Sequence, residues 1–243
     1  VELADKGQVL YGEGLKYGTE HFPTQTRVGK PIGAFYLYKT NGLFQSNEEA
    51  RQYVNADGDE YQPFADAGDI RYVDVNGDGY IDDDDKVYCG SGIPTLEVNL
   101  NFSAGYKGFD LSVVLGSAWG HKIYNGNKYF YEGMNSGSNF LTSSLNAWTP
   151  QNTNTNIPRA IFNDPNGNLK ESDRFIEKGD FVRLRQLQLG YTLPKKIMQK
   201  VFIERLRFYV SGENLFTITG YDGIDPEFSR VSVLNTGIDK LIY

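Results

Sequence analysis

The sequence lacks the residues on which several kinds of site depend. A single cysteine, Cys89, cannot form an internal disulfide, and the two histidines, His21 and His121, stand far apart with no HxxxH or CxxC pattern. A zinc site and a cysteine- or histidine-based catalytic site therefore have no support. GxGxxG and Walker-type loops are also missing, so nothing in the sequence indicates a nucleotide site.

Long apolar runs are missing as well. No stretch approaches the ~20 apolar residues that a helix needs to span a bilayer, which argues against a helical membrane protein. The sequence is still compatible with a membrane β-barrel, because the strands of such a barrel need only ~9–11 residues of alternating character. Basic residues are outnumbered, 24 against 31 acidic residues for a formal net charge of -7. This balance argues against nucleic acid or an anionic membrane surface as a partner.

Aromatic residues and glycine, by contrast, are abundant. The chain of 243 residues contains 17 Tyr, 15 Phe and 2 Trp, which make up 14% of it, together with 27 Gly. Such a mixture is typical of β-strands joined by tight turns, with tyrosines that line a sugar-binding surface or form an interfacial girdle. The length allows one large all-β domain or two small ones.

Alternation of apolar and polar residues predicts long antiparallel strands. It runs from Thr95 to Phe102 and, after the turn "GYKG", again from Phe109 to Leu115. This pattern predicts a hairpin with one apolar and one polar face and with arms of about ten residues. "DFVRLRQLQLGYTLP" predicts another long strand, with a bulge near 185–186 because the apolar positions change parity there. "RLRFYVSGENLFTI" predicts one more, and the fold class is mainly β.

The remaining segments predict loops and one or two short helices. Residues 1–30 carry glycine and charge without a period and are expected to form a loop. A short helix is expected over Asn47–Val54, capped by Ser46 or Asn47, and another over "PKKIMQKV" with Pro194 at its first position. Residues 116–180 are expected to be a long irregular stretch, which a compact domain rarely tolerates without a functional reason.

The segment "DVNGDGYIDDDD", residues 74–85, has the spacing of a calcium loop. Oxygen-bearing residues fall at positions one, three, five, seven, nine and twelve, with glycine at position six, as in an EF-hand loop. Aspartate at position twelve and the lack of flanking amphipathic helices argue against a regulatory sensor. We expect a structural calcium that braces the loop, with a solvated acidic turn as the alternative. The expected ligands are Asp74, Asn76, Asp78, the Tyr80 carbonyl, Asp82 and Asp85.

Two further groups of side chains are candidates for ligand binding. Aromatic residues of the long irregular stretch could stack on sugar rings, or they could pack that stretch against itself or against a partner. Arginines near the C-terminal strands could bind a carboxylate-bearing ligand, or they could pair with acidic residues across strands. The aromatic candidates are Tyr124, Tyr129, Phe130, Tyr131 and Trp148, and the arginines are Arg183, Arg185, Arg205 and Arg207.

Several phrases between Gly33 and Glu227 together resemble one family. In order, they are "GDIRYVDVNGDGYIDDDDKV", "YKGFDLSVVLGSAWG", "WTPQNTN", "DFVRLRQLQLGYTLP" and "RLRFYVSGENLFTITGYDGIDPE". They are similar to the C-terminal part of SusC/RagA-type TonB-dependent transporters, outer-membrane proteins of Bacteroidetes. The resemblance implies that residues 1–243 are the C-terminal portion of a transmembrane β-barrel of about 22 strands, without its plug domain. It also implies a transporter rather than an enzyme.

The same resemblance implies import of glycans or peptides. A SusD-like surface lipoprotein would cover the barrel, and TonB would act through an N-terminal part that this sequence does not contain. With "GYKG" and "PKKIMQKV" as periplasmic turns, the loop at 74–85, residues 116–180 and "GYDGIDPEF" face the outside, where calcium is available. The alternative is a secreted, calcium-braced β domain that binds glycans by aromatic stacking. That alternative requires a self-contained core that covers the apolar strand faces.

Overall fold

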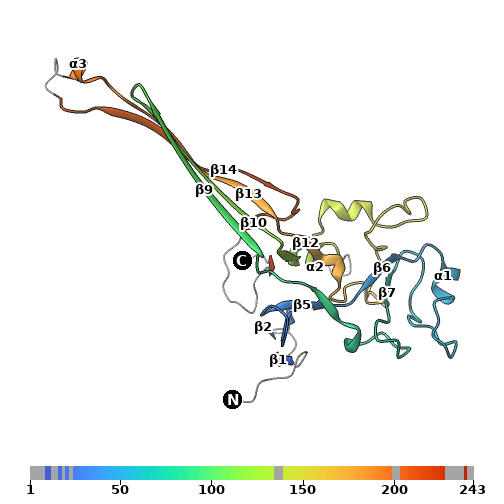
Figure 1. The fold of residues 1–243 in the computed structure, drawn as a ribbon. Coiled ribbons are helices and arrows are strands. Elements are labelled where there is room, and N and C mark those ends of the chain that lie inside the picture. Colours follow the sequence, from blue (N-terminus) through green and yellow to red (C-terminus); the bar gives the residue numbers. More distant parts are fainter. Residues whose placement is uncertain are drawn as a thin grey trace, which may run out of the picture. The chain divides into compact units, whose positions relative to one another are not determined.

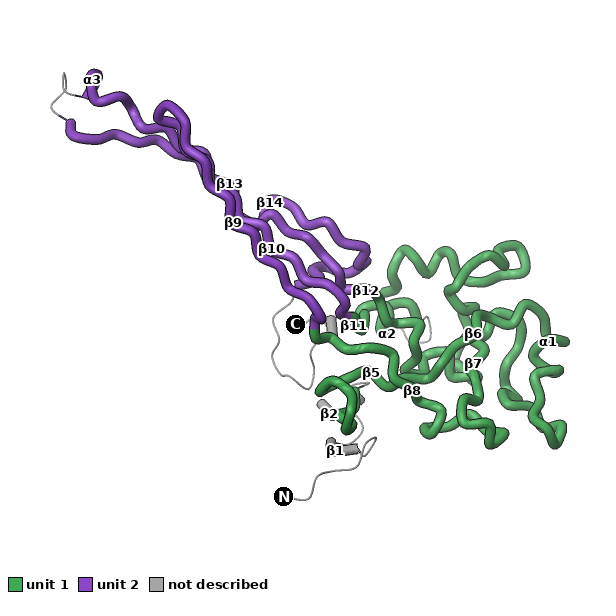
Figure 2. The backbone as a smooth tube through the Cα atoms, in the orientation of Figure 1, with its two compact units in different colours: residues 1–93, 122–177, 228–243 green, residues 94–121, 178–227 purple. Residues whose placement is uncertain are grey.

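The computed structural model describes residues 24–133, 139–198 and 203–227, together with the backbone of four short strands outside these ranges. It consists mainly of strands with a few short helices (Figure 1), which confirms the expected fold class. The chain divides into two compact units (Figure 2). Unit 1 comprises residues 1–93, 122–177 and 228–243, and unit 2 comprises residues 94–121 and 178–227. Among the described residues, no helix is both long and apolar enough to cross a membrane.

Unit 2 contains a four-stranded antiparallel sheet in the order β14-β13-β10-β9. The hairpin between β9 and β10 turns at Lys107 and Gly108, which have φ angles of 49° and 90°. Two successive residues with positive φ form the tight turn that matches the twist of a hairpin. The predicted hairpin is thereby confirmed. The strands are β9 (Leu96–Tyr106), β10 (Phe109–Trp119), β13 (Phe181–Thr192) and β14 (Arg207–Thr219).

The register of these strands gathers their apolar residues on one face. Leu115 of β10 lies opposite both Leu100 of β9 and Leu184 of β13. Directly opposed residues of antiparallel strands point to the same side of a sheet. Leu115 and Val114 of β10 lie opposite Leu184 and Gln186 of β13, which leaves Arg185 as an extra residue and confirms the predicted bulge.

Unit 1 is assembled from short strands in several small sheets. One sheet has the order β1-β4-β5-β8, β2 pairs with β3, and β6 pairs with β7. The strands are β1 (Val9–Tyr11), β2 (Lys16–Tyr17), β3 (Glu20–His21), β4 (Thr24–Arg27), β5 (Ala34–Leu37), β6 (Thr40–Leu43), β7 (Ile70–Tyr72) and β8 (Val87–Gly90). The expectation that residues 1–30 form a loop is wrong, because β1 to β4 lie there. Such short strands carry too few residues for a visible alternation.

Residues 116–180 are more ordered than expected. Strand β10 continues to Trp119, and short helices and strands follow it, with a sheet order of β12-β11-β15. These elements are too short to show a helical or strand period in the sequence, so the prediction of one irregular stretch is wrong. They are β11 (Lys122–Asn125), α2 (Gly126–Tyr131), η2 (Thr142–Asn146), η3 (Asp173–Phe175) and β12 (Ile176–Lys178), with β15 at Ile238–Asp239.

Both predicted short helices are present but begin or end differently. Helix α1 (Asn47–Arg51) is capped by Ser46, as expected, but it ends before Val54. Val54 instead forms a β-bridge with Glu60, which withdraws its backbone from the helix. Helix α3 (Lys195–Met198) follows Pro194, and the rest of that predicted helix, residues 199–201, lies outside the described residues.

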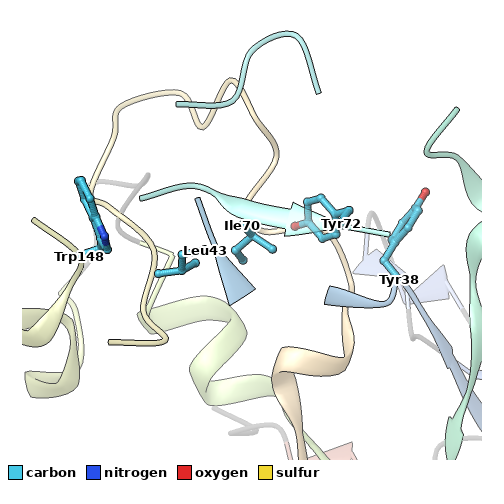
Figure 3. Close-up of a cluster of buried hydrophobic side chains, with 5 residues drawn as sticks. All are labelled: Tyr38, Leu43, Ile70, Tyr72 and Trp148. Atoms are coloured by element: carbon cyan, nitrogen blue, oxygen red, sulfur yellow. The ribbon is translucent and has the colours of Figure 1, made fainter. Parts of the chain in front are cut away.

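The cores of unit 1 join segments that are distant in the sequence. One cluster contains Tyr38, Leu43, Ile70, Tyr72 and Trp148 (Figure 3), all of them buried. A second cluster joins β5 to β11 and η3, and a third lies around α1. Burial of a large apolar side chain contributes roughly 1.5–3 kcal/mol. These clusters therefore hold together strands that are too short to be stable alone.

Candidate functional site

The acidic segment 74–85 is a tight loop whose side chains bind its own backbone. The carboxylate of Asp74 accepts hydrogen bonds from the backbone N–H groups of Gly77 (2.6 Å) and Gly79 (2.9 Å). These glycines have φ angles of 77° and 93°, in the region that favours residues without a Cβ. Aspartate and asparagine stabilise such turns by binding backbone groups a few residues further on. The glycines and acidic residues of the motif thus form the loop together.

Asp85, at position twelve, closes the loop. Its side chain is fully buried, and one carboxylate oxygen accepts from Val75 N at 2.7 Å while the other accepts from Asp82 N at 2.9 Å. A buried carboxylate is costly unless it is hydrogen-bonded. Asp82 also caps the short helix η1 (Asp83–Asp85), whose N3 residue Asp85 returns the bond. The last carboxylate of the motif therefore ties both ends of the loop together.

Side chains outside the loop anchor it to unit 1. Asp83 accepts a hydrogen bond from the Tyr38 hydroxyl at 2.8 Å and pairs with the Lys86 ammonium at 2.9 Å. These two donors, Lys86 first, hold the pKa of Asp83 below its ordinary value. Burial raises the pKa of Asp74, but the N–H groups of Gly79 and Gly77 outweigh it and the pKa is lowered. Both carboxylates are therefore stabilised in their charged form.

The expected calcium ligands have suitable chemistry but are engaged with one another. Asn76 Nδ2 donates to Asp78 Oδ2 at 2.9 Å, and the other oxygen of Asp78 accepts from Tyr80 N at 3.0 Å. Oxygens on alternate residues of a tight loop are the donor set that calcium requires. However, no three carboxylate, imidazole or thiol groups of the described residues come together closely enough to hold a metal ion. Calcium binding stays a prediction.

Two of the five candidate aromatic residues are core residues. Tyr124 is 5% exposed, and its ring stacks on Phe35 and lies 5.8 Å from the ring of Phe175. Trp148 is 8% exposed and packs directly over Gly68, where a Cβ would come within 2.4 Å of its ring. Protein atoms cover both rings, so the packing interpretation fits these two residues.

The other three candidates lie on helix α2. The ring of Tyr129 lies between Tyr124 (6.3 Å) and Phe130 (5.2 Å) and is partly buried. Tyr131 is also partly buried, whereas Phe130 is 40% exposed. The ring of Tyr129 thus packs against both Tyr124 and Phe130, and of these three residues Phe130 is the most exposed.

Three of the four candidate arginines are paired with carboxylates. Arg207 Nε donates to Asp110 at 3.0 Å, and Arg185 contacts Glu227 at 2.6 Å. Arg183 also contacts Glu227, at 3.2 Å. Pairing with acidic residues was the alternative to ligand binding, and it describes these three arginines in the structure.

Outside these candidates, the sheet of unit 2 exposes an apolar face. Leu100, Phe102, Val210 and Ile218 are each more than half exposed. Exposed apolar patches of this extent mark interaction or membrane surfaces in soluble and membrane proteins alike. The opposite face carries polar residues on all four strands, among them Glu97, Asn99, Asn101, Ser103, Asp110, Ser112, Arg183, Gln186, Gln188, Ser211, Glu213 and Thr217.

Unit 1 contains a buried network of side-chain amides that the sequence does not reveal. Gln62 accepts from Tyr72 N and donates to the Ile70 carbonyl, both at 2.8 Å, and Asn168 accepts from Ile70 N at 2.8 Å. These side chains complete the open edge of β7 in place of a neighbouring strand. A buried backbone group needs such a partner. No local pattern in the sequence marks this role, because Asn168 lies 98 residues from Ile70.

Beside this network lies a buried ion pair that the sequence does not reveal. Asp69 is fully buried, and Arg159 donates to its two oxygens at 2.8 and 2.9 Å. Asn168 Nδ2 donates to the same carboxylate at 2.9 Å. The hydrogen bond to Asp69 raises the pKa of Arg159. Every oxygen of Asp69 is satisfied, so the pair links the segment around Arg159 firmly to β7.

Comparison with known proteins gives several matches in sequence. No family model matches the chain. The TonB-dependent receptor P3 of Formosa agariphila is 33% identical over 202 residues, which are 83% of this chain and 19% of that protein. The TonB-dependent receptor SusC of Bacteroides thetaiotaomicron is 28% identical over 236 residues, 96% of this chain and 20% of SusC. The chain thus spans about a fifth of the length of these relatives, which are receptors and not enzymes.

Solved structures share the fold. A structure of the RagAB peptide importer in the closed-closed state aligns with a TM-score of 0.62 at 23% identity, over 90% of this chain and 22% of that chain. The open-open state aligns with a TM-score of 0.65 at 21% identity, over 96% of this chain and 23% of that chain. At this level of identity the likeness shows the fold, and both units contribute to it because nearly the whole chain aligns.

Proposed function

We propose that this chain, a segment of a SusC/RagA-like TonB-dependent receptor, forms part of the barrel of an outer-membrane nutrient importer. One observation carries the proposal, the sheet of unit 2 with an exposed apolar face and a polar face opposite. A sheet in a soluble protein covers such a face with a second layer. A lipid bilayer would supply the apolar surroundings here, and the polar face would line the barrel.

The lengths of the strands support a membrane location. The four strands have 11, 11, 12 and 13 residues. At ~3.3 Å per residue and a tilt of about 45°, eleven residues cover roughly 25 Å along the membrane normal. That height equals the apolar band of outer-membrane barrels, about 25 Å. The strands therefore suit a bilayer without further extension.

Aromatic residues flank the apolar face at the hairpin end. Phe109 lies opposite both Tyr106 and Tyr191, and Tyr191 lies opposite Phe208. The rings of Phe109 and Tyr191 are 4.5 Å apart. Such a row across four strands fits the girdle that aromatic side chains form at a membrane interface.

The connections between strands suggest the orientation. The turn between β9 and β10 and the short segment between β13 and β14 lie at the same end of the sheet, whereas the connection from β10 to β13 leaves from the other end. Outer-membrane barrels have short periplasmic turns and long extracellular loops. We therefore place the segment 120–180 and the loop at 74–85 on the outside, with residues 1–243 as a C-terminal portion of the barrel.

The proposed cargo and partners follow from the resemblance, and the proposed calcium follows from the spacing of oxygen-bearing residues at 74–85. The RagAB structures are of a peptide importer, which supports peptides as the cargo, and the family resemblance supports glycans as the alternative cargo. A SusD-like lipoprotein would cover the barrel and TonB would supply the energy. A structural calcium would brace the loop at 74–85, because extracellular sites bind calcium at about 0.1–1 mM. Phe130, with its accessible ring, is the aromatic residue best placed to meet a ligand.

Fractionation of source cells tests the proposal. An antibody against residues 139–198 should detect a band in the outer-membrane fraction at several times 27.3 kDa, because the relatives are about five times longer than this chain. The band should also migrate differently with and without boiling, as folded barrels resist detergent. A soluble or secreted band near 27.3 kDa would contradict the proposal and favour the secreted glycan-binding domain.

A further inference from the structure

Two arginines on the polar face of the unit 2 sheet are occupied by carboxylates of the same chain. Arg183 pairs with Asp225 through one terminal nitrogen and with Glu227 through the other, at 3.2 Å. Arg185 pairs with the second oxygen of Glu227 at 2.6 Å. Glu227 therefore bridges the two guanidinium groups, and Asp225 adds a second carboxylate to the pair.

Local backbone features bring the two arginines together. Arg185 is the extra residue of the bulge in β13 opposite β10, and its side chain lies over Gly116 of β10. A Cβ at Gly116 would lie 2.1 Å from Arg185 Nε, so the arginine needs a glycine there. Arg183 is held by Thr217, whose hydroxyl accepts from Arg183 Nε at 2.9 Å. The sheet itself therefore holds both arginines in place, independently of the acidic residues that pair with them.

The acidic partners belong to the segment 220–227, called the strap below. It follows β14 and returns over the polar face, with Tyr221 buried beside Gly223. The Glu227 N–H donates to Asp225 at 2.8 Å, which sets both carboxylates side by side. Their side chains are 42% and 33% exposed. Ion pairs with this much exposure are weak individually, so a competing anion can displace them.

The arginine pair also has unused capacity. Arg183 is 11% exposed and all three of its nitrogens have partners. Arg185 is 41% exposed, and its buried Nε has no hydrogen-bond partner among the described residues. The guanidinium fork of arginine binds a carboxylate through two parallel hydrogen bonds. Nε lies against Gly116 and is out of reach of a ligand, but Glu227 contacts Nη2, so the other terminal nitrogen of Arg185 is the donor left for an incoming carboxylate.

We propose that Arg183 and Arg185 form a binding site for a carboxylate of the imported ligand, and that the strap fills this site until such a ligand displaces it. The proposal rests on the proposed function, in which the polar face lines the barrel. Glu227 and Asp225 stand in for the ligand carboxylate. Because a short tether gives the two strap carboxylates an effective concentration of about millimolar, a free carboxylate must exceed that concentration to displace them. Peptides carry the required group, whereas neutral glycans do not.

Hydrogen exchange of the full-length protein, read by mass spectrometry, tests whether the ion pairs hold the strap. Glu227→Gln should raise exchange in residues 220–227 about two- to fivefold, as expected for loss of partly exposed ion pairs. Glu213→Gln is the matched control, because it removes the same charge from the same face outside the strap. Equal exchange in the two variants would overturn the proposal.

Exchanging the two charges distinguishes loss of the ion pair from a general destabilisation of the fold. Arg185→Glu and Glu227→Arg should each open the strap, and the double variant should lower the exchange below that of either single variant, with part of the increase remaining because the introduced arginine also faces Arg183. If the double variant is as open as either single variant, the pair does not hold the strap and the proposal fails.

Ligand displacement is tested with trialanine and trialanine amide, which differ in the terminal carboxylate alone. Trialanine, at about ten times the millimolar effective concentration of the strap, should raise exchange in residues 220–227, and the amide should not. The effect should vanish in Arg185→Gln. Equal effects of both peptides, or no effect of either, would overturn carboxylate recognition. Cell fractionation tests the membrane location independently of hydrogen exchange. Failure of this proposal can therefore be distinguished from failure of the proposed function.

Discussion

The two units place their apolar side chains in opposite ways. Unit 1 buries them, and Tyr72, Phe35 and Phe175 are fully covered although they lie on short strands or turns. Unit 2 exposes them, and Leu100 and Val210 project from long regular strands into open space. Unit 1 carries its own cores, whereas the sheet of unit 2 requires an apolar medium outside the chain. Aromatic and aliphatic residues are thus buried in one unit and exposed in the other.

The units also differ in how their polar groups are satisfied. In unit 2, backbone groups bind each other along four long strands, with the register interrupted at the bulge in β13. In unit 1, side chains such as Gln62 and Asn168 bind the open edge of a three-residue strand. A substitution in unit 1 should therefore destabilise the protein mainly when it leaves a buried polar group without its hydrogen-bond partner. A substitution in unit 2 should destabilise it mainly when the new side chain does not suit the surroundings of its sheet face.

The largest effect should come from the buried ion pair of unit 1. Arg159→Met leaves the fully buried carboxylate of Asp69 without its cation, which should lower the free energy of unfolding by about 3–5 kcal/mol. Chemical denaturation monitored by tryptophan fluorescence measures it, because Trp148 lies in this unit. Arg51→Met, which removes exposed pairs with Glu60 and Asp66, should cost about 1 kcal/mol or less. Equal losses would refute a special role for the buried pair.

A charge on the apolar face of unit 2 should have the next largest effect. Leu187→Arg, near the middle of β13 on the apolar face, should destabilise the folded protein in a bilayer by about 2–4 kcal/mol, whereas Gln188→Arg, on the polar face one residue away, should be tolerated. Folding into lipid vesicles, followed by the shift in migration without boiling, distinguishes the two variants. Similar behaviour of both would contradict the assignment of lipid-facing and barrel-lining faces.

Crowding against Trp148 should give a smaller loss. Gly68 and Gly58 have nearly the same φ, 89° and 88°, but a Cβ at Gly68 would meet Trp148 at 2.4 Å and a Cβ at Gly58 would meet nothing. Both substitutions to alanine bear the cost of the left-handed conformation, about 1–2 kcal/mol. Gly68→Ala should cost about 1–3 kcal/mol more, because it overpacks the core. Thermal melting of the two variants measures the difference, and equal melting temperatures would show that the ring moves freely.

Calcium should have the smallest effect of the four. At about ten times its dissociation constant, calcium should stabilise the loop at 74–85 by about 1.4 kcal/mol. Melting with calcium and with a chelator measures this shift, and Asp74→Ala or Asp78→Ala should abolish it. Asp57→Ala, outside the loop, should leave the shift intact. Identical melting with calcium and with chelator would show that the loop does not bind calcium and is stabilised by its own hydrogen bonds.

The sequence by itself determined the features that depend on neighbouring residues. Alternation predicted β9 and β10, the change of parity predicted the bulge at Arg185, and Ser46 predicted the start of α1. Strand period, turn conformation and helix capping are local, since each involves residues within a few positions. The mainly β fold of the chain was therefore readable before any contact was known.

Tertiary structure alone decided which side chains meet across long distances in the chain. It buried Tyr124 and Trp148 in cores, set Asn168 on the edge of β7 and brought Glu227 to Arg183 and Arg185. Asparagine, glutamate and tryptophan look the same in a sequence whether they face solvent, a ligand or a partner side chain. Their roles depend on packing between segments that share no local pattern, and packing is a property of the folded chain.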